Sequence, residues 1–347
     1  MLPAMGLFRK LQKKPTLFLS TTGMQLKRFE QLLPEFEKAY KQLETQRKSC
    51  VVKTGEERQR QAGGGAQFST ALPERLLMLL LYYRLYLTQE FMTLLFEVES
   101  KATISRAIGL MRPVFEVVLP VPERARETVV ALAEKETHRR RGRINNIEDF
   151  LEEYPELSIL IDGTEQPKQR PQDKKKRKSD YSGKKKRHTP GQIITATSKG
   201  IILDQSPSVG GRCHDFRAFK AHVADGAAGR AMLEQFGALR VVATSDSGFT
   251  GIERLSLPCS TRVVERARRG HPLTVEQKVL NRVRSRERIQ VEHTIGRRKK
   301  YRIASAVYRN ADEHYDGAME VVAGLVNLRA YDRIAAATGI DLLNWRI

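Results

Sequence analysis

Two short apolar segments that lead into aspartate constrain the fold of this chain more than any other feature. Residues 158–162 read Ser-Ile-Leu-Ile-Asp and are followed by Gly163, and residues 240–245 read Arg-Val-Val-Ala-Thr-Ser and are followed by Asp246. Short apolar runs of this kind predict buried strands. Glycine near the acid lets the chain turn sharply and lets a substrate approach. Two strands that each end in an acid predict an α/β domain with its functional site at that edge of the sheet.

The surrounding sequence predicts further strands and helices. Residues 192–197 and 201–206 predict two strands joined by a turn at Lys199 and Gly200, with the second continuing towards Val209. Three helices are predicted as well. They cover residues 214–223, 275–300 and 317–336. Thr274 and Gln277 form a capping-box pattern at the start of the second of these helices.

The long helix supplies a third acid. Glu292 shares one helical stripe with Ser285, Arg288 and Lys299, whereas Glu287 lies off it. Hard cations such as Mg²⁺ prefer carboxylate oxygens, and two such ions activate an attacking oxygen and stabilise a leaving oxygen on phosphorus. Two strand aspartates and one helix glutamate would supply the ligands. The alternative is an ordinary solvated, salt-bridged helix face.

The N-terminal part is predicted to be helical. Residues 25–47 have the spacing of an amphipathic helix, with Pro34 as a predicted break, and Gly63–Gly65 predict a linker. Three further helices are predicted over residues 73–86, over 89–98 with Thr88 as cap, and through 104–115 with Ser100 or Thr103 as cap. This order is typical of a helix-turn-helix DNA reader, in which Lys101, Thr103, Ser105, Arg106 and Arg112 would be exposed. A plain three-helix bundle with a basic face is the alternative.

The charge of the chain indicates a polyanionic partner. Its 61 Lys and Arg against 40 Asp and Glu give a net charge of +21 and a pI near 10.0. Residues 168–187 alone hold eleven Lys and Arg against two Asp, and include Lys184, Lys185, Lys186 and Arg187. Such a run binds phosphates without sequence preference. A disordered loop or an import signal is the alternative, but its position just after Asp162 favours a loop that faces DNA.

Other classes of protein fit the sequence poorly. The longest apolar run, residues 76–81 continued by two tyrosines, stops at Arg84, which is too short to span a membrane. The three cysteines contain no CxxC pair, which argues against a disulfide framework or a zinc finger. No signal peptide is evident at the N-terminus. We therefore expect no membrane partner.

Five motifs in this order resemble those of DDE transposases of the insertion-sequence-five and harbinger-like group. They are Ile161-Asp162-Gly163-Thr164-Glu165, residues 181–189 (Tyr-Ser-Gly-Lys-Lys-Lys-Arg-His-Thr), Gly211-Arg212-Cys213-His214-Asp215, Asp246-Ser247-Gly248-Phe249-Thr250-Gly251 and Val291-Glu292-His293. The resemblance covers about residues 17–328. It implies a ribonuclease H-like α/β catalytic domain over 151–347, a helix-turn-helix region over 71–150, and a helical arm with a linker over 1–70.

The resemblance also implies a chemistry. Asp162, Asp246 and Glu292 would bind two Mg²⁺ ions, for which Mn²⁺ could substitute. Arg288 and Lys299 match the family pattern around the glutamate, while Ser285 stands where the family has tyrosine. His214 and Asp215 would support the site, with helix capping an equal alternative for His214.

The implied function is a transposase that recognises the terminal inverted repeats of an insertion element. It would hydrolyse phosphodiesters at the element ends and join the 3′-hydroxyls to target DNA as a homo-oligomer. The implied compartment is the bacterial cytoplasm at the nucleoid, or the nucleus for a eukaryotic source. The alternatives are a catalytically silent, domesticated transposase that regulates by binding DNA, and a metal-dependent endonuclease without strand transfer.

Overall fold

The computed structural model describes residues 6–49, 70–140, 158–238, 242–255, 257, 259–267 and 270–344. The predicted linker at Gly63–Gly65 lies outside these ranges. The chain divides into two units, one of residues 1–119 with Tyr301–Ile303 and one of residues 120–300 with 304–347. The predicted domain limits at residues 70 and 150 stay predictions.

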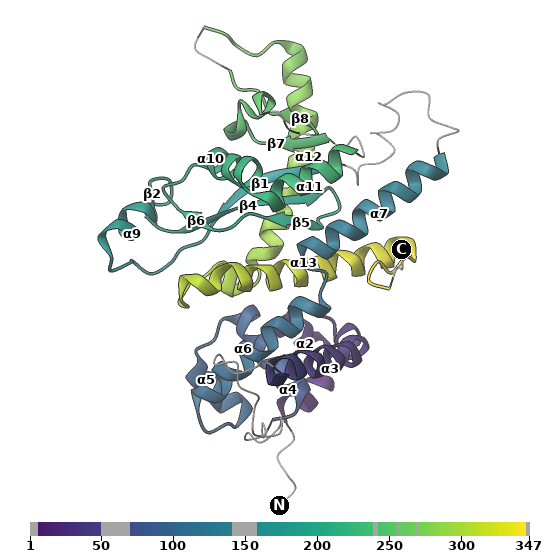
Figure 1. Cartoon of the computed structure of the whole chain (residues 1–347), viewed down its shortest axis with the longest axis vertical. Coiled ribbons are helices and arrows are strands. Elements are labelled where there is room, and N and C mark those ends of the chain that lie inside the picture. The colour runs from purple at the N-terminus through teal and green to yellow at the C-terminus, as the bar shows by residue number, and fades with distance from the viewer. Residues whose placement is uncertain are drawn as a thin grey trace, which may run out of the picture. The chain divides into compact units, whose positions relative to one another are not determined.

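A mixed sheet organises the second unit (Figure 1). Its strands lie in the order β5-β4-β1-β7-β8, and β6 also pairs with β4. The central strand β1 runs antiparallel to β4 and parallel to β7, and β7 runs parallel to β8. The strand bounds are Ile159–Glu165 for β1, Pro190–Thr197 for β4, Ile202–Gln205 for β5, Val209–Gly210 for β6, Val242–Ser245 for β7 and Ser260–Val263 for β8.

The extent of β1 corrects one prediction. The sequence predicts that the strand ends at Asp162, but β1 continues to Glu165 because the residues after Asp162 keep pairing with β4. Gly163 lies opposite Ile193, so this glycine is a paired strand residue rather than a turn. The other strand does end where predicted, since Ser245 is the last residue of β7 and Asp246 follows it.

Helices cover both faces of the sheet. On one face, Ile159 and Ile161 join a core with residues of α7 (Pro122–Arg140), α10 (Asp215–Lys220) and α11 (Ala227–Ala238). Side chains alternate along a strand, so Leu160 and Asp162 point to the opposite face. There, α12 (Val275–Lys299) lies against β1, β4 and β7. The last long helix, α13 (Tyr315–Thr338), contacts α7, α12 and β5.

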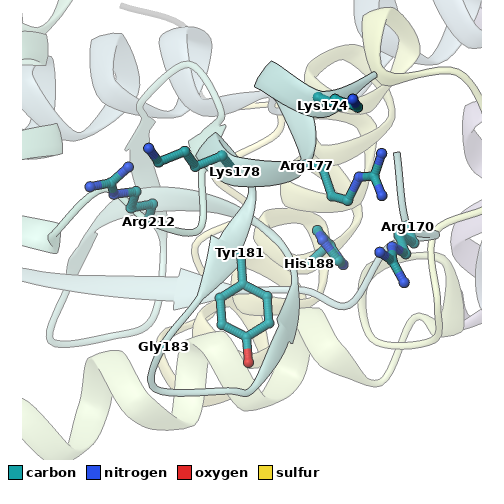
Figure 2. A pocket seen from close by; sticks show the side chains of 8 residues that line it. All are labelled: Arg170, Lys174, Arg177, Lys178, Tyr181, Gly183, His188 and Arg212. Carbon is teal, nitrogen blue, oxygen red and sulfur yellow. The ribbon is translucent and has the colours of Figure 1, made fainter. Parts of the chain in front are cut away.

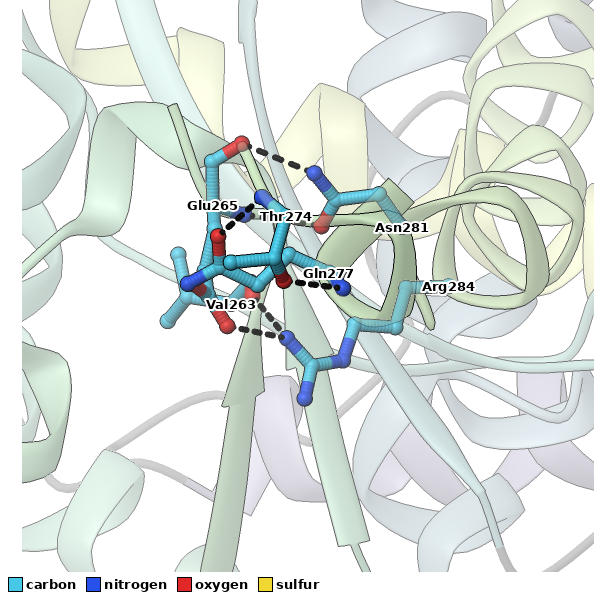
Figure 3. A network of polar contacts seen from close by, with 6 residues as sticks. All are labelled: Val263, Glu265, Thr274, Gln277, Asn281 and Arg284. Carbon is cyan, nitrogen blue, oxygen red and sulfur yellow. Dashed lines mark hydrogen bonds and ion pairs between the residues drawn. The ribbon is translucent and has the colours of Figure 1, made fainter. Parts of the chain in front are cut away.

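The N-terminus of α12 is fixed by the polar network that Figure 3 shows. The Thr274 hydroxyl accepts a hydrogen bond from the Gln277 amide, and the Gln277 side chain accepts one from the Thr274 amide, which confirms the predicted capping box. Asn281 exchanges two hydrogen bonds with the backbone of Glu265, and Arg284 donates to the Val263 carbonyl at 2.7 Å. These bonds tie the helix to the segment that follows β8.

A small insertion between β1 and β4 carries the basic run. It contains α9 (Lys174–Ser179) and a two-stranded ribbon of β2 (Tyr181–Ser182) and β3 (Arg187–His188). Asp173 caps α9 by accepting a hydrogen bond from the Lys176 amide at 2.7 Å. The disordered-loop alternative is therefore wrong for this run.

The described residues of the first unit form helices but no strand, with an aromatic core through Phe8, Phe18, Phe29, Phe36 and Phe115. Its helices are α1 (Leu7–Gln12), α2 (Pro15–Thr22), α3 (Leu26–Ser49), α4 (Leu72–Leu85), α5 (Gln89–Phe96) and α6 (Lys101–Val118).

Two local predictions in this unit have opposite outcomes. The predicted break at Pro34 is wrong, since α3 is continuous across it. Buried Phe29 and Phe36 on either side of the proline anchor the helix and offset its lost hydrogen bond. The predicted cap of α5 is confirmed, because Thr88 accepts a hydrogen bond from the Phe91 amide.

Candidate active site

Asp162 and Asp246 are brought together by the register of two parallel strands. Ile161 of β1 lies opposite Ser245 of β7, and each aspartate is the next residue along its chain. Burial is the main cause that raises the pKa of Asp162, and repulsion from Asp246 adds to it. The pair therefore follows from sheet topology and not from sequence proximity.

Asp162 lies in an environment that disfavours its charge. Burial, opposed by a hydrogen bond from the Gly163 amide and by the charge of Arg288, raises its pKa from 3.8 to about 6, with Asp246 and Asp215 adding repulsion. The Gly163 amide donates to its Oδ1 at 2.9 Å, and Arg288 Nη1 lies 3.9 Å from its Oδ2. An additional cation at this position would relieve the repulsion among the three aspartates.

Asp246 begins a short 3₁₀ turn over Ser247–Phe249. The Ser247 hydroxyl donates to Asp246 Oδ1 at 3.2 Å, and Arg266 Nε donates to that hydroxyl at 2.8 Å. Arg266 is not among the residues predicted from the sequence. Its only signal in the sequence is a basic side chain between β8 and α12, and basic residues are too frequent in this chain for one of them to mark a site residue.

Asp215 approaches the pair from the other face of the sheet. A Cβ at Gly163 would come within 2.5 Å of the Asp215 carboxyl carbon, so glycine is what allows this approach. Burial raises the pKa of Asp215, and Lys184 opposes the shift. His214 caps α10, with its Nδ1 accepting from the Phe216 amide at 3.4 Å. This is the capping alternative from the sequence analysis.

Glu165 belongs to the first of the five motifs but is not among the predicted site residues. It lies two residues beyond Gly163 on β1, hence on the face of Asp215, and it raises the Asp215 pKa. Its Oε2 accepts a hydrogen bond from the Thr189 hydroxyl at 2.8 Å. No local pattern identifies it, because the sequence predicts that the strand ends at Asp162, whereas Glu165 is placed by the pairing of residues 163–165 with β4.

Two residues of the predicted α12 stripe, Arg288 and Lys299, lie near Asp162, whereas Glu292 pairs with Arg288 and is not grouped with the aspartates. Arg288 Nη2 lies 2.7 Å from Glu292 Oε1, and the Glu292 side chain is 47% exposed. Burial, followed by the charge of Lys185, lowers the pKa of Lys299, while Asp162 and Glu165 oppose the shift. Glu287 instead accepts a hydrogen bond from Thr244 of β7 at 3.3 Å.

The tip of the β2–β3 ribbon carries Lys184, Lys185 and Lys186, and Arg187 begins β3. All four side chains are exposed. Lys184 acts on the Asp215 pKa and Lys185 on that of Lys299, so these two lysines lie beside the carboxylates. Lys186 adopts a left-handed backbone with φ 55° at the turn.

The donor chemistry fits a divalent cation in part. Three mutually repelling aspartates offer the hard oxygens that Mg²⁺ takes. However, no three His, Cys, Asp or Glu side chains in the described ranges are grouped closely enough to hold a metal. Glu292 would complete a ligand set by leaving Arg288. Exposed i,i+4 ion pairs contribute about 0.3–0.5 kcal/mol, and although Arg288 is only 23% exposed, the Glu292 carboxylate that would move is 47% exposed.

Of the five α6 residues predicted to be exposed, Lys101, Ser105 and Arg106 are exposed, whereas Thr103 and Arg112 are half-buried. Lys101 Nζ lies 3.1 Å from Glu90 Oε1 of α5, and Arg106 Nε donates to the Ala102 carbonyl at 3.2 Å. Both contacts are on the surface, where phosphate can replace them at low cost. None of the described helices is both long and apolar enough to cross a membrane.

Comparisons with known proteins match both units. Residues 161–327 match the profile of the "DDE superfamily endonuclease", and residues 71–120 match the "Helix-turn-helix of DDE superfamily endonuclease". The chain is similar to the "Probable transposase for insertion sequence element IS702" of Microchaete diplosiphon, with 35% identity over 172 residues. These residues are 49% of this chain and 56% of that relative, so the chain spans only about half of the relative's length. No solved structure matches the chain significantly.

Proposed function

The chain belongs to the DDE superfamily endonucleases and carries the superfamily's helix-turn-helix, and from this premise we propose that it is a transposase. It binds the terminal inverted repeats of an insertion element, cleaves phosphodiesters at the element ends and joins the 3′-hydroxyls to target DNA. One observation carries the proposal. Parallel register sets Asp162 beside Asp246, and the site raises the pKa of Asp162 to about 6.

Each side chain of the site has a proposed role. Asp162, Asp246 and Glu292 hold two Mg²⁺ ions, or Mn²⁺ in their place. Arg288, Lys299 and the Lys184–Arg187 tip hold the phosphates on either side of the scissile bond. When bound, the metal ions supply Lewis-acid activation of the attacking oxygen and stabilise the leaving oxygen.

The rest of the constellation orients these groups. Ser247 and Arg266 fix Asp246 through their hydrogen bonds, and Gly163 leaves the space that Asp215 occupies. Lys101 and Arg106 of α6 contact the element ends. Because two ends are joined to one target, we propose that the active form is a homo-oligomer on DNA.

The test is cleavage and strand transfer on labelled duplexes taken from the DNA that flanks the gene. Wild type, Asp246→Asn and Glu292→Gln are compared with and without Mg²⁺. Glu287→Gln is the matched control, since it changes an acid on the same helix but off the stripe. Wild type and the control should join DNA only with Mg²⁺, and the two site variants should lose at least about a hundredfold in rate.

Other results would select the alternatives. Cleavage without joining would replace the proposal with a metal-dependent endonuclease. Tight binding of the ends with no chemistry in any variant would leave a DNA-binding regulator. Full activity of Glu292→Gln would remove Glu292 from the ligand set.

A further inference from the structure

A basic hollow lies on the insertion that separates β1 from β4 (Figure 2). Its volume is about 840 Å³, and five Lys or Arg side chains, one tyrosine, one histidine and one glycine line it. They come from α9, from both strands of the ribbon and from the flanking segments at Arg170 and Arg212. No acid is among the lining residues.

The charges of this hollow are not neutralised within the described parts of the chain. No described carboxylate forms an ion pair with Arg170, Lys178 or Arg212. The two acids of the basic run are engaged elsewhere, since Asp173 caps α9 and Asp180 lies 2.6 Å from Lys168. Several cations around one concave surface attract an anion, and five Lys or Arg side chains are enough to bind more than one phosphate group.

Tyr181 adds an aromatic surface among these cations. Tyr181 is 42% exposed, so part of its ring is accessible to a ligand. The ring of His188, on the paired strand, meets it in an edge-to-face arrangement at 5.6 Å. An exposed aromatic ring beside cations is the combination on which nucleic-acid bases stack while their phosphates are bound.

The hollow is separate from the lysines beside the carboxylates but belongs to the same ribbon. Tyr181 and His188 pair at the base of the ribbon, whereas Lys184 and Lys185 at its tip act on Asp215 and Lys299. A DNA strand that passes the carboxylates along the ribbon would reach the hollow within a short stretch of backbone.

We propose that this hollow binds an unpaired nucleotide of the DNA strand, with its base on Tyr181 and its phosphates on Arg170, Lys178 and Arg212. Bases in an intact duplex stack on each other, so a protein ring reaches a base face only where the nucleotide is single-stranded or extruded. The volume of the hollow lies in the range of small-ligand sites. The proposal rests on the transposase function for its partner, DNA.

The test measures binding of the full chain in EDTA, so that no chemistry is needed. The probes are one fluorescent single strand, a duplex of the same sequence with a bulged 2-aminopurine, and the fully paired duplex. Tyr181→Ala should weaken binding of the first two probes by about tenfold or more, with less than a twofold effect on the paired duplex. Tyr181→Phe keeps the ring and should bind all three like the wild type.

Two further variants keep the result interpretable. Lys178→Glu should weaken the probes with unpaired nucleotides more than the paired duplex, whereas Lys184→Ala should weaken all three alike. Equal losses on all probes with Tyr181→Ala, or no loss on any, would overturn the nucleotide site. A thermal melt of each variant detects misfolding. If Tyr181→Ala is misfolded, the binding of Tyr181→Phe and Lys178→Glu to the three probes decides whether the nucleotide site exists. A failed cleavage assay would leave this result intact, because the two experiments share no readout.

Discussion

At the scale of single residues, the site brings together aspartates that repel one another. The pKa of Asp162 is raised to about 6. Burial raises this pKa, and only the Gly163 amide and the Arg288 guanidinium at 3.9 Å act to lower it. A buried acid with a raised pKa is typical of functional sites, where charge is arranged for a ligand and not for stability. Without a cation, this arrangement destabilises the fold.

This destabilisation predicts the pH dependence of Asp162→Asn. The folded protein binds the Asp162 proton more tightly than the unfolded chain does, with a pKa of about 6 against 3.8. The favourable contribution of the protonated group is therefore complete below pH 3.8 and is lost as the pH rises through about 6. In EDTA, Asp162→Asn should match the wild type near pH 4 and exceed it above pH 6, by up to about 3 kcal/mol.

Denaturant unfolding at several pH values measures this difference. Asp173→Asn is the control, because it makes the same acid-to-amide change at an exposed residue that caps the short helix α9 away from the site. An Asp162→Asn protein that is no more stable than the wild type at pH 7.5 would contradict the electrostatic account of the site.

At the scale of elements, local sequence patterns predict individual helices, caps and strands. They do not predict which strands that are distant in the sequence pair with each other. The capping box at Thr274 and the apolar run before Asp246 are local signals, and the structure confirms the first in full and the second over Val242–Ser245, since residues 240 and 241 lie outside the described ranges. The end of β1 was mispredicted because its last residues are held by pairing with β4, which no local pattern encodes. β8 is half exposed and weakly apolar, so it gave no strand signal.

The same distinction holds for the candidate site. The three predicted acids could be chosen from strand and helix patterns together with the family resemblance. Glu165 and Arg266 could not, because their place depends on the sheet register and on the path of the chain after β8. The basic run was found by composition alone, but its fold into α9 and a ribbon, with Tyr181 exposed, required the structure.

The cap of α12 leads to a prediction at this scale. Thr274→Ala removes the acceptor for the Gln277 amide and should cost about 1 kcal/mol, while Thr274→Ser keeps it. Hydrogen exchange should therefore accelerate at the Gln277 amide in the alanine variant only. Glu292 lies several turns further along the helix, so the cleavage rate should change little. A large loss of cleavage with unchanged exchange would show that Thr274 acts at the site rather than on the helix end.

At the scale of the whole molecule, the net charge of +21 is what any DNA meets first. Much of it lies outside the candidate site, so it supplies attraction without sequence preference. Sequence preference must come from fewer contacts, such as those proposed for α6. DNA binding through the general charge excess and binding through the site should therefore depend differently on salt concentration, so that a salt titration distinguishes the two contributions.

The last prediction uses this difference. Each phosphate contact adds about 0.9 to the slope of log affinity against log salt concentration for duplex DNA. Replacing Lys184 and Lys185 by alanine should therefore reduce the slope by about 2 if both bind phosphate. Replacing Arg217 and Lys220, which are exposed on α10, removes the same charge away from the ribbon and should leave the slope nearly unchanged. Fluorescence anisotropy between 50 and 200 mM salt, the range over which phosphate contacts alter affinity by orders of magnitude, measures both slopes. Equal reductions in the two double variants would mean that net charge alone governs binding and that the ribbon tip has no special place on the DNA.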